Sequence, residues 1–209
     1  GKELEEDGTP EESWKPRPLR EVIRIPGVKE IMVAFFCYCG LESTTGLWTG
    51  SYLTLHTGLT AEAAATFTSL VFLGITIGRA LNGFLAFRFD DDQLIHLGET
   101  IIAIGTVMLL LPIHVENYQL IAIMLIGLGC APVYPCIIHS TPANFGPEKS
   151  QALIGVQMAS AYVGTLLMPP VFGLIANHIG AWTMPIYLLA ILALMTVMHE
   201  RMLQKVHSG

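Results

Sequence analysis

The segment IMVAFFCYCGLESTTGLWTGSYLTLH, residues 31–56, decides the class of this protein, because it sets a single carboxylate, Glu42, inside a run with no other Asp, Glu, Lys or Arg. About 20 predominantly apolar residues are enough for a helix to cross roughly 30 Å of hydrocarbon. A carboxylate at that depth costs roughly 2.5–3.5 kcal/mol on insertion scales, so it calls for a partner, water or a function. The rest of the chain indicates whether the solvent is lipid.

The composition is that of a membrane protein. Of the 209 residues, 52% are hydrophobic and 13% are charged, and the mean hydropathy is +0.56, whereas soluble domains carry about 25% charged residues. The acidic residues gather at the start of the chain and in DDD at 90–92, which are typical solvated segments and indicate no nucleic-acid partner. The four cysteines stand at spacings that place neither pair on one helix face, so we expect small apolar fillers.

Six apolar segments follow a polar, proline-punctuated start, at about 29–56, 64–88, 94–113, 118–140, 150–177 and 181–199. Each is long enough to span a bilayer, and the separators are short and polar. We therefore expect an all-α membrane protein with six transmembrane helices in a bundle over 28–200. Residues 1–27 are expected to form a linker or tail with a short helix near its end, and 201–209 a C-terminal tail. The chain begins with Gly, as a piece of a longer polypeptide would.

Lysine and arginine predict the orientation. They precede the first segment, follow the last, and occur in the second and fourth connections, and they are missing from the first, third and fifth. By the positive-inside rule both termini are expected in the cytoplasm.

Two features inside the spans favour a transporter. Glycines recur in the second, fourth and fifth segments, where they let helices approach closely. Pro132 and Pro135 flank Tyr134 in the fourth segment, and Pro169 and Pro170 lie in the fifth. Prolines at that depth free backbone carbonyls, and broken helices in matching halves mark solute sites.

On these segments the chain resembles the C-terminal six-helix half of a major facilitator superfamily transporter, and within it the bacterial fucose-permease-like sugar porters. The resemblance is carried by FFCYCGLESTTGLWTGSYL at 35–53, GITIGRALNGFLAFRF at 74–89, GLGCAPVYPCIIHSTPANFG at 127–146 and GVQMASAYVGTLLMPPVFGLIANHIG at 155–180. It implies two inverted three-helix repeats, half of a twelve-helix fold, a central solute cavity lined by the first and fourth spans, and a bacterial inner-membrane location. The missing partner would be the N-terminal six-helix half.

One motif departs from the family pattern. The cytoplasmic-loop signature G-x-L-A-D-R-x-G-R-R reads GFLAFRFDDD at 83–92, so Arg88 is kept and Phe87 replaces the aspartate. The resemblance therefore assigns Arg88 at most a minor gating role.

A polar stripe predicts the cavity face of the first span. Glu42, Thr45, Thr49, Tyr52 and His56 recur at helical spacing, and polar stripes inside apolar spans face protein or water rather than lipid. Trp48, one position off the stripe, would offer a stacking surface for a sugar. Glu42 is also the candidate for proton coupling, since a closed cavity would favour its protonated form and a water-filled one its release.

Further polar residues lie at depth in the other spans. Arg79 could pair with Glu99, extend to the interface or face the solute path, and the first two options are preferred. The remaining cavity candidates are Asn82, Tyr134, Gln157 and Tyr162, each of which could equally serve packing. Asp92, His96 and Glu99 share a helix face, but a three-aspartate loop is usually solvated, so we expect no metal and no other cofactor.

The sequence thus predicts a secondary active transporter of a small polar solute, a sugar by first choice, coupled to protons. Export of a metabolite or drug is the alternative, and a channel-like or structural membrane subunit is the rival outside transport. An enzyme is not expected, because no nucleophile with its base, phosphate-binding loop or metal cage is recognisable.

Overall fold

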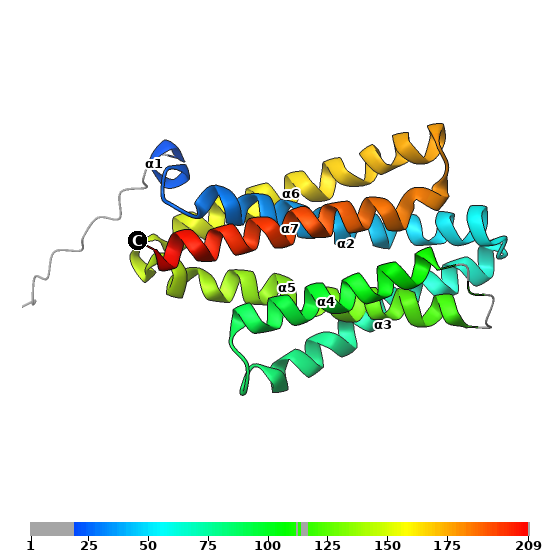
Figure 1. The fold of residues 1–209 in the computed structure, drawn as a ribbon, viewed down its shortest axis with the longest axis horizontal. Helices are drawn as coiled ribbons and strands as arrows, with labels where there is room; N and C mark the ends of the chain where they lie inside the picture. Colours follow the sequence, from blue (N-terminus) through cyan, green and yellow to red (C-terminus); the bar gives the residue numbers. More distant parts are fainter. Residues whose placement is uncertain (1–18, 112, 114–116, 209) are drawn as a thin grey trace, which may run out of the picture.

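The computed structural model describes residues 19–111, 113 and 117–208, and within these residues it is all-helical. The helices are α1 (Leu19–Ile23), α2 (Val28–Thr57), α3 (Ala61–Leu85), α4 (Asp91–Leu110), α5 (Tyr118–Phe145), α6 (Pro147–His178), the 3-10 turn η1 (Ala181–Thr183) and α7 (Met184–His207). The six long helices, α2 to α7, are each apolar enough to cross a membrane. The predicted fold class of six spanning helices is confirmed (Figure 1).

Local chemistry explains where the helices begin and end. Helix α2 ends at Gly58, whose φ of 74° is the left-handed conformation that glycine adopts without strain. Asp90 caps α4 in a capping box with Gln93. The DDD segment at 90–92, predicted to be a solvated loop, therefore forms the cap and the start of α4. Helix α7 continues to His207, well beyond the predicted end at 199, so the expected tail is largely helical. Of the predicted linker, residues 1–18 lie outside the described residues.

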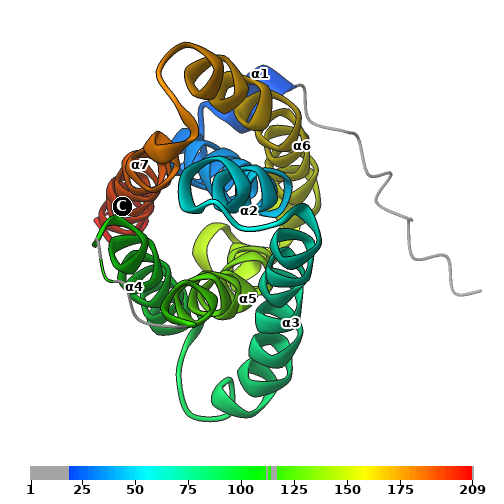
Figure 2. The same ribbon diagram turned by 90° about the vertical axis from the view of Figure 1, so that its right-hand side faces the viewer.

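The six long helices form two groups of three, α2–α4 and α5–α7, and the contacts of one group correspond to those of the other. Helix α2 packs mainly on α6 and α7, and α5 packs mainly on α4 and α3. Exchanging α2, α3 and α4 for α5, α6 and α7 turns one set of contacts into the other, as expected of two inverted repeats. Viewed along the bundle, α2 and α5 lie at its centre and the other helices surround them (Figure 2).

Glycines permit the closest crossings in equivalent places of the two repeats. A Cβ on Gly74 of α3 would stand 2.5 Å from the carbonyl oxygen of Met124 in α5. At the equivalent crossing, a Cβ on Gly164 of α6 would overlap the carbonyl oxygen of Phe36 in α2. The helix axes approach because these positions carry no side chain.

The prolines do not interrupt the helices as predicted. Helix α5 runs through Pro132 and Pro135, and α6 runs through Pro169 and Pro170. Side chains of neighbouring helices donate hydrogen bonds to carbonyls beside them: Trp48 Nε1 to Pro169 at 3.1 Å, Tyr187 Oη to Met168 at 2.8 Å, and Tyr38 Oη to Cys130 at 2.8 Å. These bonds tie α2 and α7 to the proline-containing stretches of α5 and α6, although they do not reach the carbonyls four residues before each proline, which are the ones that a proline frees.

Candidate functional site

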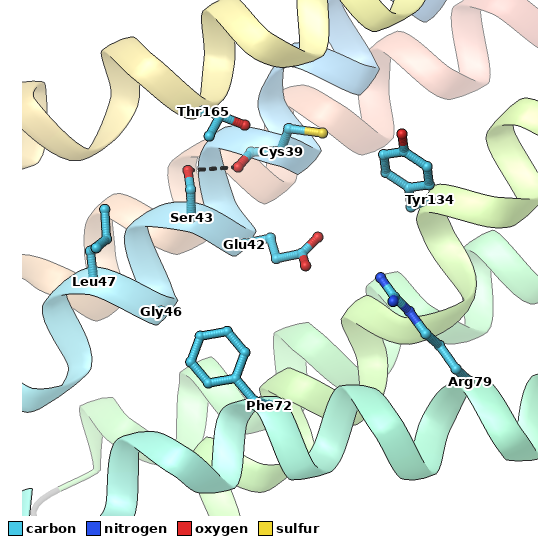
Figure 3. Close-up of a pocket in the computed structure, with 9 residues that line it drawn as sticks. All are labelled: Cys39, Glu42, Ser43, Gly46, Leu47, Phe72, Arg79, Tyr134 and Thr165. Atoms are coloured by element: carbon cyan, nitrogen blue, oxygen red, sulfur yellow. Dashed lines mark hydrogen bonds between the residues drawn. The ribbon is translucent and has the colours of Figure 1, made fainter. Parts of the chain in front are cut away.

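A pocket of about 370 Å³ opens between α2, α3, α5 and α6 near the middle of α2. Helix α2 contributes five residues to its lining, and single residues come from α5 and α6. The lining consists of Cys39, Glu42, Ser43, Gly46, Leu47, Phe72, Arg79, Tyr134 and Thr165. Figure 3 shows these side chains around one open space.

The pocket brings together one acidic and one basic side chain, Glu42 and Arg79. The Glu42 carboxylate points into the pocket from α2, and the Arg79 guanidinium extends into the same space from α3 (Figure 3). Glu42 is half-buried, Arg79 is exposed, and no ion pair within 4.0 Å joins them. A carboxylate accepts hydrogen bonds and a guanidinium donates them, so the space between the two groups offers both kinds of partner. The arrangement can therefore hold a polar solute or water between the two groups.

Tyr134 closes the pocket on the α5 side. Its ring lies 5.0 Å from that of Phe35 and 6.5 Å from that of Tyr38, and its hydroxyl contacts the Met158 sulfur at 3.0 Å. A thioether is a weak acceptor. The phenol therefore keeps hydrogen-bonding capacity for a ligand.

Most of the predicted polar stripe of α2 does not line this pocket. Thr45 and Thr49 are buried, and their hydroxyls donate to the carbonyls of Leu41 and Thr45 in their own helix. The buried Tyr52 donates to the Leu109 carbonyl at 3.2 Å and lies in a separate hollow together with His56. Of the stripe, Glu42 alone lines the central pocket.

Two aromatic candidates also lie elsewhere. Trp48 packs edge-on against Phe172 and donates to Pro169, so its indole closes the contact between α2 and α6. Tyr162 is 62% exposed and does not line the pocket.

The two amide candidates are used in packing. Gln157 is fully buried and accepts a hydrogen bond from Thr141 at 3.1 Å. Asn82 contacts the Cys136 sulfur and borders a small cavity of about 70 Å³ between α3, α4 and α5. Neither lines the pocket of Glu42.

The expected pair between Arg79 and Glu99 is not formed. Glu99 is 5% exposed and faces His96, with 3.2 Å between Oε2 and Nδ1, while Arg79 faces the central pocket. Arg88 lies exposed in the turn after α3, and no ion pair among the described residues includes it.

A signal for the pocket face was present in the sequence. Cys39, Ser43 and Gly46, all small, recur at spacings of four and three residues beside Glu42. At about 100° per residue their face is turned by roughly 100° from the threonine stripe, and Glu42 lies at the edge shared by both. Small residues leave the space that a cavity needs.

Comparison with known proteins agrees with this architecture. A family model described as Major Facilitator Superfamily matches residues 11–203. The chain is 24% identical over 197 residues to "Bypass of stop codon protein 6" of Saccharomyces cerevisiae, covering 89% of this chain and 39% of that protein.

Solved transporters share the fold. Structures of FucP, described as a major facilitator superfamily transporter in the outward conformation and as the E. coli fucose:proton symporter, superpose with a TM-score of 0.74 at 20% identity, covering 87% of this chain and 44% of theirs. A POT family transporter bound to a thioalcohol-conjugated peptide superposes with a TM-score of 0.69 at 16% identity, covering 85% of this chain and 37% of its own. The chain therefore spans less than half the length of these relatives.

Proposed function

The chain belongs to the major facilitator superfamily of membrane transporters, and on that premise we propose that it is the C-terminal six-helix half of a secondary active transporter that carries a small polar solute by alternating access. A sugar is the proposed solute and a proton the proposed coupling ion. The second half would be the N-terminal six helices of the same transporter, which together with this bundle would enclose a site near the bilayer midplane.

The observation that carries the proposal is the facing pair of Glu42 and Arg79 in the central pocket. Charged side chains inside spans are costly, and they are retained where they line a solute or ion path. A carboxylate accepts hydrogen bonds and a guanidinium donates them, so together they match a solute that carries several hydroxyl groups. The Tyr134 phenol and the Ser43 and Thr165 hydroxyls add neutral partners around the same space.

The apolar part of the lining favours a second candidate. Leu47 and Phe72 face the same pocket, and a site that combines apolar surface with one acid and one base also suits an amphiphilic metabolite or drug. Export of such a compound is therefore the alternative function. Likeness to a fucose:proton symporter gives support to the first candidate only by analogy of fold.

Transport by the full-length protein tests the proposal. Uptake of a panel of labelled sugars into proteoliposomes is measured beside export of amphiphilic dyes, with the variants Glu42→Gln and Arg79→Gln. Because no ion pair among the described residues includes Arg79, Arg79→Gln is expected to fold normally and to lose transport. Normal solute affinity and transport in both variants would refute the assignment of this pocket.

Proton coupling is tested on the same preparation. Glu42→Gln keeps the size and hydrogen bonding of the side chain but cannot release a proton. The variant is expected to bind solute and exchange it across the membrane, while losing accumulation driven by a pH gradient. Glu62→Gln, the same change at an exposed carboxylate in the first turn of α3, is the matched control. Unchanged accumulation in Glu42→Gln, with lowered affinity, would make Glu42 a solute ligand only.

A further inference from the structure

A second cluster of ionisable side chains lies between α4 and α7, away from the central pocket. His96 and Glu99 come from the first half of α4, and His199 lies about two-thirds of the way along α7. The two helices lie side by side in both views of the fold (Figures 1 and 2). They are the third helices of the two repeats, so the cluster joins one repeat to the other.

The three side chains converge closely. One ligand atom of each lies within 4.8 Å of the others, and the rings of His96 and His199 are 5.3 Å apart between centroids. His199 is 1% exposed and Glu99 is 5% exposed, whereas His96 is half-buried. An open hollow of about 500 Å³, lined in part by His96 and Glu99, adjoins the cluster and offers a path for an ion.

Three polar atoms of the buried members lack hydrogen-bond partners. Neither ring nitrogen of His199 nor Oε1 of Glu99 makes a hydrogen bond to any described residue. Asp92 approaches His199 Nε2 at 3.5 Å, but the contact does not have hydrogen-bond geometry. An unpaired polar group in the interior costs about 1–3 kcal/mol, and an ionised one costs more. Unpartnered groups that point at one another mark a place that a cation would satisfy.

We propose that His96, Glu99 and His199 bind a divalent transition-metal ion, with Zn²⁺ the best match. Two imidazoles and one carboxylate with an open fourth position form a known zinc ligand set. Tetrahedral ligands at about 2.0–2.1 Å from zinc stand roughly 3.3 Å apart. His96 Nδ1 and Glu99 Oε2 already lie at 3.2 Å, and a ligand atom of His199 lies within 4.8 Å of the other two residues' ligand atoms, so His199 would have to move closer on binding the ion.

The surroundings fit the needs of metal-bound histidine. With Nδ1 toward Glu99, the other ring nitrogen of His96, Nε2, lies 3.2 Å from Oε1 of Glu200, at ion-pair distance. Asp92 Oδ1 lies 3.5 Å from His199 Nε2, close enough that a small rotation of either side chain would form a hydrogen bond. Carboxylates that accept from the second ring nitrogen fix the tautomer of a ligating histidine and raise its affinity for metal. The ion would clamp α4 to α7 at the end of the bundle where α4 begins.

The sequence did not point to this site. It places Asp92, His96 and Glu99 on one face of α4, a pattern that is usually solvated, and the fold adds the buried His199 from about 100 residues further along the chain.

Metal content and affinity test the proposal. The full-length protein is purified with a histidine-free tag, loaded with Zn²⁺, desalted and analysed by plasma mass spectrometry, and its affinity is measured by competition with a chromophoric chelator. One zinc ion per chain is expected. X-ray absorption at the zinc edge is expected to show nitrogen and oxygen ligands at about 2.0–2.1 Å.

Variants assign the ligands. His199→Ala and Glu99→Gln are expected to weaken binding by about 100-fold or more, because even supporting residues contribute about 10–100-fold. His96→Gln, at a half-buried position, serves if His199→Ala fails to fold. His178→Ala removes an imidazole that bonds only within α6 and is expected to bind zinc as the unmodified protein does. Zinc-free protein after loading, or equal zinc in His96→Gln and His178→Ala, would overturn the proposal and leave a hydrogen-bonded cluster only.

Discussion

Adding one methyl group to Gly74 should weaken the bundle, although alanine is the better helix former. The new Cβ would stand 2.5 Å from the Met124 carbonyl oxygen and 3.0 Å from the Leu128 nitrogen, and both are backbone atoms that cannot rotate away. Because ordinary contact begins at 3.4 Å, α3 and α5 would have to separate by about 0.9 Å at this crossing.

The size of the effect follows from two opposing contributions. A gap of roughly 0.5–1 Å forfeits about a quarter to a half of the dispersion energy of the atoms that face it, and overpacking in cores costs about 1–3 kcal/mol. The higher helix propensity of alanine offsets this loss of stability by up to about 1 kcal/mol. We therefore expect Gly74→Ala to lower the free energy of unfolding by about 1–2 kcal/mol.

The same helix supplies the control. A Cβ on Gly83 meets nothing within 4 Å, so Gly83→Ala should be neutral or stabilising by up to about 1 kcal/mol. Thermal unfolding in detergent, followed by the fluorescence of a thiol-reactive dye, measures both variants, because the four cysteines are buried in the fold and become fully accessible on unfolding. Equal Tm values for the two variants would refute the account of the α3–α5 crossing.

Three further outcomes are expected. Single cysteines introduced at Asn117 and Glu148 should label from opposite sides of the membrane, and labelling of both from outside would contradict the predicted orientation. Tyr52→Phe should lower the free energy of unfolding by about 1 kcal/mol, because it removes the buried hydrogen bond to Leu109, and unfolding in denaturant checks this while solute affinity stays unchanged. Thr49→Val should leave solute affinity unchanged as well, since the hydroxyl donates to a carbonyl within α2. A binding titration that shows weaker affinity would mean that this face of α2 lines the solute cavity.

Thr45, Thr49 and Tyr52 are buried against other helices, but the sequence could not say whether they would face packed protein or a cavity. Helix α2 contacts α3, α5, α6 and α7, so most of its circumference is covered. A threonine hydroxyl satisfies itself on its own helix at the i−4 carbonyl, as Thr45 and Thr49 do. An ionised carboxylate can only accept hydrogen bonds, and the backbone N–H groups of its own helix are already used. Glu42 therefore cannot be satisfied within α2, and it projects into the pocket.

Arg79 shows the same limit. The sequence allows it to pair with Glu99, to extend to the interface or to face the solute path, and it favours the first two options. In the fold, Glu99 turns toward α7 and Arg79 turns toward α2. Helix rotation decides this, since about 100° per residue separates a side chain that faces one neighbour from one that faces another.

The number of helices, their approximate ends and the family were determined by the sequence alone. Hydrophobic length and turn chemistry are local properties, and in lipid each backbone group must be satisfied within its own helix, so six apolar runs become six helices whatever their neighbours are. Tertiary structure alone decided which side chains meet: Glu42 with Arg79 across the pocket, and His199 with His96 and Glu99 at the junction of α4 and α7. These meetings depend on how helices far apart in the chain rotate and cross, and that is set by glycine contacts and interhelical packing, which no local pattern encodes.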